Sequence, residues 1–227
     1  MRNAQRAKAL RLTLPVLCGY LFLGFAFGAT MTQAGFGPLW VLSASSLVYA
    51  GSLQFVMVPF LASGISLAAV ALTALMINAR HLFYGLSCIG RFNRMGRARP
   101  YMIFSLTDET YSVLCTLPGD ESDGVLVRVA LYDHLYWITG SVLGALMTQG
   151  LPFDLTGIDF AMTALFVVIA VERLMNPGDR FALAVGAYCA VIMLLLLGPD
   201  AFLAPALAVT ALVLTIADIS SQKEAAR

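Results

Sequence analysis

The sequence predicts an all-α, polytopic helical membrane protein that forms a single transmembrane domain over residues 1–227. Of the 227 residues, 59% are hydrophobic and only 12% are charged, whereas about 25% of the residues of a soluble domain are charged. The mean hydropathy is +0.83. This composition excludes a soluble enzyme and a disordered chain. The net charge of +1 produces no field that would attract a nucleic acid.

Apolar segments follow one another along the chain, separated by short stretches rich in glycine, proline and charged residues. They cover residues 12–34, 38–62, 65–90, 101–117, 126–149, 158–172, 181–197 and 201–218. Their periodicity is helical, without the alternation of a β-barrel strand. The basic residues before the first segment resemble the start of a signal peptide. Because the apolar run continues past residue 30 and more segments follow, we expect an uncleaved first helix.

The positions of the basic residues predict which loops face the cytoplasm, because loops rich in lysine and arginine stay on that side. Twelve of the 14 basic residues lie at or beyond segment ends: Arg2, Arg6, Lys8, Arg11, Arg91, Arg94, Arg97, Arg99, Arg173, Arg180, Lys223 and Arg227. If all the segments span, the group at 91–99 is outside. If 38–62 and 158–172 each enter and leave on one side, six segments span and all twelve are cytoplasmic. We expect this second arrangement, with cytoplasmic termini and an external acidic loop at 118–124.

An internal repeat supports a two-fold plan. Residues 20–33 (YLFLGFAFGATMTQ) and 136–149 (YWITGSVLGALMTQ) share seven identities in fourteen positions, offset by 116 residues. The shared residues of the first copy are Tyr20, Gly24, Gly28, Ala29, Met31, Thr32 and Gln33. With six spans the two copies run in opposite directions, so halves 12–117 and 126–218 are expected to form an inverted repeat. Secondary transporters often have this plan, with the substrate near the midplane.

The segment 38–62 holds polar residues without charge, among them Gly51, Ser52 and Gln54. A Gly-Ser break in an apolar run frees backbone groups that can line a cavity, as in the broken helices of transporters. The alternative is an ordinary helix whose small residues pack against a neighbour. The charge distribution favours the broken or re-entrant form.

Ionisable residues at membrane depth are the candidates for a substrate or proton site. Asn78, Arg80 and His81 follow a long apolar run, and Asp108 and Glu109 lie within the segment 101–117. Charges at this depth are costly, so they mark a function unless they only pair with one another. We expect Arg80 to pair with Asp108 or Glu109 while the other carboxylate faces a cavity. The alternative is a purely structural salt bridge.

Asp133 and His134 lie in the fifth apolar segment, and the expected role of Asp133 is helix packing, with a second proton site as the alternative. The four cysteines lie in apolar stretches without a CxxC motif, which indicates packing and no metal site. The sequence has no P-loop, HExxH or GxSxG motif, so we expect no enzyme activity, no catalytic residues and no cofactor.

Several strings together resemble the AzlC family, the large subunit of branched-chain amino-acid exporters. They are SSLVYAGSLQF (45–55), LTALMINARHLFYGLS (72–87), LTDETYSVL (106–114), YWITGSVLGALM (136–147) and DFAMTALFVVIAVERL (159–174). The resemblance covers nearly the whole chain in order, although Asp133 and His134 receive no role from it. It implies export of leucine, isoleucine, valine and their analogues across a bacterial plasma or inner membrane. It also implies a small hydrophobic partner subunit of the AzlD type.

The residues fit this activity on their own chemistry, because a zwitterion needs a cation for its carboxylate and an anion for its ammonium group. Arg80 and the pair Asp108–Glu109 supply these charges. The expected function is therefore a proton-coupled exporter of branched-chain amino acids. The alternatives are a channel-like or uptake permease for another small solute and, less favoured, a membrane-embedded enzyme using His81 with a carboxylate.

Overall fold

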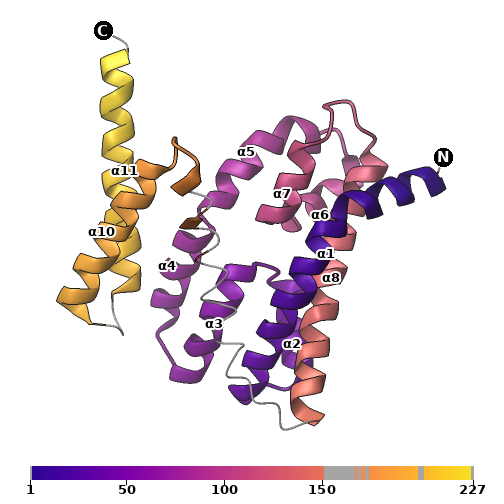
Figure 1. Ribbon diagram of the computed structural model, residues 1–227, viewed down its shortest axis with the longest axis horizontal. Helices are drawn as coiled ribbons and strands as arrows, with labels where there is room; N and C mark the ends of the chain where they lie inside the picture. The colour runs from indigo at the N-terminus through magenta and orange to yellow at the C-terminus, as the bar shows by residue number, and fades with distance from the viewer. Residues whose placement is uncertain (1, 151–166, 168–169, 172–173, 199–201, 226–227) are drawn as a thin grey trace. The chain divides into compact units, whose positions relative to one another are not determined.

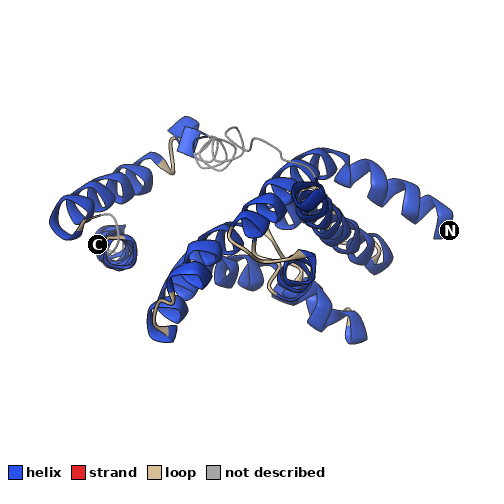
Figure 2. Ribbon diagram, turned by 90° about the horizontal axis from the view of Figure 1, so that it is seen from below, coloured by secondary structure: helices blue, strands red, loops and turns tan. Residues whose placement is uncertain are grey.

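The computed structural model describes residues 2–150, 167, 170–171, 174–198 and 202–225, and the regular structure in these ranges is helical (Figure 2). The predicted all-α membrane class is confirmed. Two compact units are present: residues 1–64 with 77–162, and residues 65–76 with 163–227. The expected re-entrant segment 158–172 lies outside the described residues, apart from 167 and 170–171.

The two longest helices of the first unit, α1 (Arg2–Gln33) and α8 (Asp123–Gly150), pack side by side (Figure 1). At 1.5 Å per residue they are about 48 and 42 Å long, whereas the hydrocarbon core of a bilayer is about 30 Å thick. Of the described residues, 3–33 and Arg180–Leu197 form helices that are long and apolar enough to cross a membrane. Helix α8, which carries Arg128, Asp133 and His134 along its length, is not among them.

The two copies of the repeat face each other across this helix pair, and they run parallel. Near the start of both helices, the Lys8 ammonium contacts the Glu121 carboxylate. Further along, Thr13 Oγ1 lies 3.2 Å from Tyr136 Oη. At the far end, a Cβ on Gly37 would lie 3.7 Å from Gln149. The expected inverted orientation of the two copies is therefore wrong.

The repeated glycines explain how closely the two backbones approach. A Cβ on Gly24 would lie 2.9 Å from the Trp137 carbonyl oxygen, and one on Gly140 would lie 2.8 Å from the Leu21 carbonyl oxygen. Side chains larger than hydrogen do not fit at such distances. Small residues four apart on both helices thus give a close parallel packing of the GxxxG type.

The segment 38–62 is broken, as predicted. Helix α2 (Pro38–Leu47) runs from the far end of the pair toward its middle, where the Ser45 carbonyl lies 3.3 Å from His134. After residues 48–50 the chain turns back as α3 (Gly51–Ser63), and Phe55 packs on Phe27. With 10 and 13 residues, each is shorter than the about 20 residues of a spanning helix.

The segment 101–117, expected to be one span, is also broken. Helix α6 (Arg99–Phe104) ends before residues 105–107, and α7 (Asp108–Cys115) starts after them. The Thr107 side chain accepts a hydrogen bond from the Thr110 amide, which caps the start of α7. The two half-helices enter from the N-terminal end of the α1–α8 pair and return to it, opposite to α2 and α3 (Figure 1).

The segment 65–90, expected to be one helix, is interrupted at Ala79 into α4 (Leu67–Asn78) and α5 (Arg80–Phe92). Helix α5 runs beside α7. The contact is seen in the rings of Tyr84 and Tyr111, which stack with centroids 4.4 Å apart. A short 3₁₀ turn, η1 (Gly96–Ala98), then leads into α6. An apolar core fills the N-terminal end of this unit: Ala9, Cys88, Phe92, Met95, Met102, Leu106, Leu114, Val125, Leu126, Val129 and Ala130.

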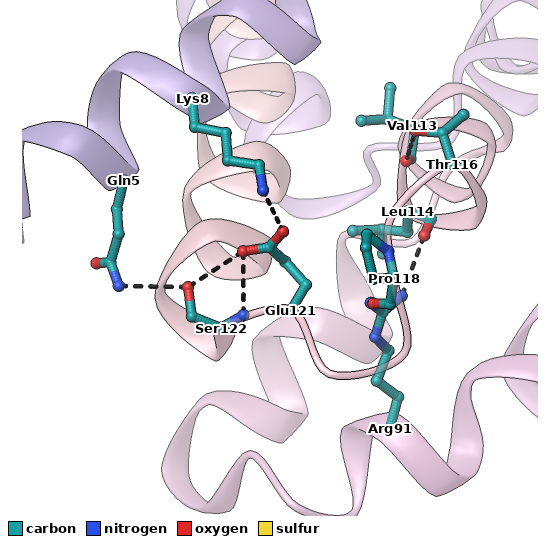
Figure 3. A network of polar contacts seen from close by, with 9 residues as sticks. All are labelled: Gln5, Lys8, Arg91, Val113, Leu114, Thr116, Pro118, Glu121 and Ser122. Carbon is teal, nitrogen blue, oxygen red and sulfur yellow. Dashed lines mark hydrogen bonds and ion pairs between the residues drawn. The ribbon is translucent and has the colours of Figure 1, made fainter.

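The acidic loop lies at the N-terminal end of α1. Figure 3 shows Lys8 and Gln5 of α1 pointing toward Glu121 and Ser122 of the loop. Gln5 Nε2 donates to Ser122 Oγ at 3.3 Å. The hydrogen bond from Lys8 holds the pKa of the Glu121 carboxyl below its usual range, so this contact weakens only as the solution becomes acidic.

Arginines in the last turn of α5 and just after it hold the same loop from another side. Arg91 donates to the carbonyls of Leu114 and Pro118 (Figure 3), and Arg94 donates to the Gly119 carbonyl at 3.2 Å. The C-terminal end of α5, with Arg91 and Arg94, and the start of α1 therefore lie at the same end as the acidic loop. The expectation that 118–124 faces the side opposite to the N-terminus is wrong. Arginine and lysine set orientation while acidic residues contribute little, so an acidic loop on the basic side breaks no rule.

Cysteine labelling tests this arrangement. In a background without the native cysteines, we expect Asp120→Cys and Arg97→Cys to react with an impermeant maleimide from one face of the membrane. Gln33→Cys, at the other end of α1, is expected to react from the opposite face. Labelling of Asp120→Cys and Gln33→Cys from the same face would contradict the parallel packing of α1 and α8.

In the second unit, α10 (Arg180–Leu197) packs against α11 (Leu203–Ala225). Gly186 faces Thr210, with a Cβ–Cγ2 distance of 3.8 Å if a Cβ were added. Leu195 is 80% exposed and Leu196 is 70% exposed. Such consecutive exposed leucines suit a surface that faces lipid.

Candidate functional site

Three helix interruptions bring polar residues to the middle of the first unit. The interruptions are at 48–50, at Ala79 and at 105–107, and α3, α5 and α7 each begin directly after one of them. We call the polar residues gathered there the central cluster: Tyr20, Ser52, Arg80, Thr107, Asp108, Glu109, Thr110 and Asp133.

Arg80 joins the first turns of these three helices. Its Nη1 lies 2.8 Å from Asp108 Oδ2, and its Nη2 donates to Ser52 Oγ at 3.0 Å. Both ionic side chains are about one-third exposed, at 34% and 30%. Arg80 Nε and Asp108 Oδ1 are buried and have no hydrogen-bond partner among the described residues, so the pair has unused capacity to bind a ligand.

The first turns of α3 and α7 add polarity of their own, because the residues before them have non-helical backbone angles. The N-terminus of a helix carries a partial positive charge and free amide groups, which favour a negatively charged group. In α7 this charge is opposed by Asp108 and Glu109 of the first turn. In α3 the first turn carries no acidic residue, and Ala50 before it provides no side-chain cap. The start of α3 is thus the better position for a carboxylate.

Glu109 does not contact Arg80 and instead belongs to a hydrogen-bonded group with α1. Tyr20 Oη donates to Glu109 Oε2 at 2.7 Å and also lies 2.7 Å from Thr107 Oγ1. The Tyr20 ring packs edge-on against Trp137 of α8, with centroids 5.3 Å apart. Asp108 and Glu109 therefore have different partners, as expected of neighbours on a helix.

Asp133 of α8 is completely buried, and its Oδ2 accepts a hydrogen bond from Thr110 Oγ1 at 2.9 Å. The next residue, His134, stacks on Tyr49 with ring centroids 4.1 Å apart. Its Nε2 lies 3.3 Å from the Ser45 carbonyl oxygen and its Nδ1 lies 3.2 Å from Tyr101 Oη. Because a carbonyl only accepts, Nε2 carries the hydrogen and Nδ1 accepts from Tyr101.

Tyr49 lies between α2 and α3 with φ of +40°, and no other non-glycine residue of the described chain has a positive φ. A tyrosine in this region of backbone space is strained and persists only when its surroundings hold it. The stacked His134 ring provides that support, so the break in 38–62 is tied to α8.

The remaining predicted site residues lie nearby without joining the cluster. Gln54 is completely buried in α3, and neither its amide oxygen nor its amide nitrogen has a partner among the described residues. His81 Nδ1 lies 3.2 Å from the Asn78 carbonyl oxygen, and its ring lies beside Tyr84. Gly51 faces Trp137, where a Cβ would lie 3.4 Å from the indole ring.

Sequence reasoning gave no site role to Tyr49, Thr107 or Thr110, and it named Tyr20 only as part of the repeat. One signal was available, because the string Thr107-Asp108-Glu109 has the form of a helix N-cap followed by an acidic first turn. That pattern predicts a helix start inside the segment 101–117. Tyr20 had no such signal, since a tyrosine in an apolar run is usually a packing residue.

The comparison with known proteins decides the family. The AzlC protein family profile matches residues 15–151, which covers more than half of the chain. The chain belongs to the AzlC family. The expected resemblance is thereby confirmed, and the chain is assigned to a transport family.

Bacterial relatives are similar to this AzlC-family chain over most of their length. The branched-chain amino acid transport protein AzlC of Bacillus subtilis is 35% identical over 207 residues, which cover 90% of this chain and 82% of the relative. A membrane protein of Haemophilus influenzae is 37% identical over 90% of this chain and 85% of its own length. The inner membrane protein YgaZ of Escherichia coli is 33% identical over 68% of this chain and 67% of its own. No solved structure matches the chain.

Proposed function

We propose that this AzlC-family protein is a proton-coupled secondary transporter that exports branched-chain amino acids, together with a small AzlD-type membrane subunit. The observation that carries this proposal is the similarity to the Bacillus subtilis branched-chain amino acid transport protein over 90% of the chain. The central cluster supports it chemically, because a zwitterionic substrate needs opposite charges a few ångströms apart.

In this proposal the substrate exchanges partners with the Arg80–Asp108 pair. The substrate carboxylate takes the place of Asp108 on the Arg80 guanidinium, which can hold a carboxylate through two parallel hydrogen bonds. The released Asp108 then accepts the substrate ammonium group. When the site is empty, Arg80 and Asp108 form an ion pair with each other, with Nη1 and Oδ2 2.8 Å apart. When substrate is bound, each is paired with the substrate instead, so the exchange leaves no charge unpaired.

Neighbouring groups complete the proposed site. The amides at the start of α3, beside Ser52, add donors for the carboxylate. Gln54, with its unpartnered buried amide, supplies one further donor and acceptor. Glu109 lies next to Asp108 and contacts Tyr20 instead of a cation, which suits a carboxylate that carries the coupling proton.

We also propose that the end of the first unit that carries the N-terminus faces the cytoplasm. The contacts of Lys8, Arg91 and Arg94 gather basic side chains at that end. Basic residues near the ends of membrane helices remain on the cytoplasmic side. Export then proceeds from this end toward the end that holds Gln33.

Transport in proteoliposomes tests the function. With the AzlD-type subunit present and a pH gradient imposed, we expect labelled leucine, isoleucine and valine to accumulate, and we expect the signal to disappear when the gradient is collapsed. Omitting the subunit is expected to abolish or strongly reduce transport. Absence of movement for all three amino acids, with both the subunit and the gradient present, would contradict the proposed function.

A further inference from the structure

We propose that the hydroxyl groups of Tyr20, Thr107 and Thr110 form a proton relay between Glu109 and the buried carboxyl group of Asp133. The inference rests on the proposed proton coupling and names the residues that carry it out. It assigns Asp133 the proton-carrying role that the sequence offered only as the alternative to helix packing.

The relay is a continuous chain of oxygen atoms contributed by α1, α7, α8 and the α6–α7 break. Glu109 Oε2 lies 2.7 Å from Tyr20 Oη, which lies 2.7 Å from Thr107 Oγ1. Thr107 Oγ1 lies 3.2 Å from Thr110 Oγ1, which lies 2.9 Å from Asp133 Oδ2. The link between the two threonines is the longest, so a small movement of the α6–α7 break would open or close the chain there.

Counting hydrogens explains why this arrangement stores one proton. Each of the three hydroxyl groups provides one hydrogen, whereas the chain contains the four oxygen–oxygen contacts measured above. With both carboxyl groups ionised, one contact has no hydrogen. A single added proton, on Glu109 or on Asp133, completes every contact. The two placements differ only in the direction in which the hydrogen bonds point.

Transfer along the relay balances at each oxygen. A proton on Glu109 passes to Tyr20 Oη while the Tyr20 hydrogen passes to Thr107, and in turn each threonine hydrogen moves one oxygen further, until Asp133 gains one. Each hydroxyl loses one hydrogen and gains one, so the net change is one proton moved from Glu109 to Asp133. The hydrogen bonds of the chain then all point the other way.

The two ends of the relay have different environments. Glu109 is partly exposed and follows directly on Asp108 of the ion pair. Asp133 is completely buried, its Oδ1 has no hydrogen-bond partner, and no lysine or arginine of the described chain forms an ion pair with it. An isolated buried carboxylate is costly in an apolar interior, and a proton removes that cost. The relay therefore joins a partly exposed carboxyl group to one that solvent does not reach.

Other titratable groups face the two carboxyl groups. On the α1 side is Tyr20 itself, and on the side of α6 and the α2–α3 break are Tyr101 and Tyr49, within electrostatic range of Asp133. His134 follows Asp133 and is tied to Tyr101. Arg80 is engaged by Asp108. Because these groups can also affect the pH dependence of transport, the relay is tested by removing its own hydroxyl groups.

The test removes single hydroxyl groups and keeps the side-chain shape. Tyr20→Phe and Thr110→Val are reconstituted with the AzlD-type subunit, and proton movement coupled to leucine is recorded with a pH-sensitive dye. We expect at least about a tenfold loss of coupled proton flux in both variants. Exchange of labelled for unlabelled leucine at equal pH moves no net proton, so we expect it to persist.

Matched controls are present in the chain. Tyr136 is the counterpart of Tyr20 in the repeat, and its hydroxyl contacts Thr13 outside the relay, so Tyr136→Phe is expected to keep the proton flux. Thr110→Ser retains the hydroxyl and is expected to restore the flux lost in Thr110→Val. Leucine exchange reports in each case that the variant is folded.

The outcomes separate the relay from the proposed function. Wild-type proton flux in Tyr20→Phe or in Thr110→Val would overturn the relay, as would a wild-type protein that exchanges leucine without any proton flux. Absence of leucine exchange in the wild type would reject the proposed substrate. The comparison is then made on the proton flux that an imposed pH gradient drives without leucine: flux that Tyr20→Phe abolishes and Tyr136→Phe retains would still support the relay, and flux equal in both would overturn it.

Discussion

Replacement of Arg80 with alanine is expected to abolish amino-acid transport and to reduce the amount of folded protein in the membrane. The change leaves the Asp108 carboxylate without its cation and removes the hydrogen bond to Ser52. Breaking one partner of a buried ion pair costs about 3–5 kcal/mol. Because both side chains are about one-third exposed, we expect the lower end of this range. Thermal unfolding of the detergent-solubilised protein measures the stability, and leucine uptake measures the activity.

Two further variants separate the two effects of Arg80. The double variant Arg80→Ala with Asp108→Ala removes both charges, so we expect it to regain much of the stability while transport stays absent. Arg97→Ala changes an exposed arginine of η1 outside the cluster and is expected to match the wild type. Full transport in the stable double variant would show that the ion pair is only structural.

Leucine in place of Gly28 or Gly144 is expected to prevent stable assembly of the first unit. A Cβ on Gly28 would collide with the Ser141 carbonyl oxygen and one on Gly144 with that of Phe25. These are backbone atoms that no side-chain rotation can move aside. Overpacking of a core costs about 1–3 kcal/mol where side chains can adjust, and we expect more here. Yield and thermal unfolding of the purified protein measure the effect.

Gly19→Leu is the matched control, because Gly19 lies in α1, as Gly28 does, but has no atom within 4 Å of an added Cβ. We expect this variant to be produced at the wild-type level. Normal yield and stability for Gly28→Leu and Gly144→Leu would contradict the close packing of α1 and α8.

Sequence patterns were sufficient for the fold class and for part of the site. Hydropathy and composition indicated a helical membrane protein. The polar residues around Gly51 indicated the break after α2, and the cost of isolated charges indicated that Arg80 pairs with a carboxylate. Each of these follows from residues whose environment can be judged locally.

Orientation could not be predicted in the same way, because it depends on contacts between distant segments. Counting basic residues placed 118–124 opposite to the N-terminus, whereas Lys8 and Arg91 hold this loop at the same end. The repeat indicated that two helices are alike, but not their relative direction, which is seen only in the contacts between α1 and α8. Asp133 and Tyr20 likewise acquire their partners only when α1, α7 and α8 come together.

The central claim is that the Arg80–Asp108 pair binds the two charges of an amino acid. The most direct measurement is the binding of leucine to the purified protein, compared with leucinamide, which lacks the carboxylate, and 4-methylpentanoate, which lacks the ammonium group. A hydrogen bond to a charged group contributes about 1.5–3 kcal/mol, so each analogue is expected to bind at least about tenfold more weakly. Equal binding of leucine and either analogue would contradict this account.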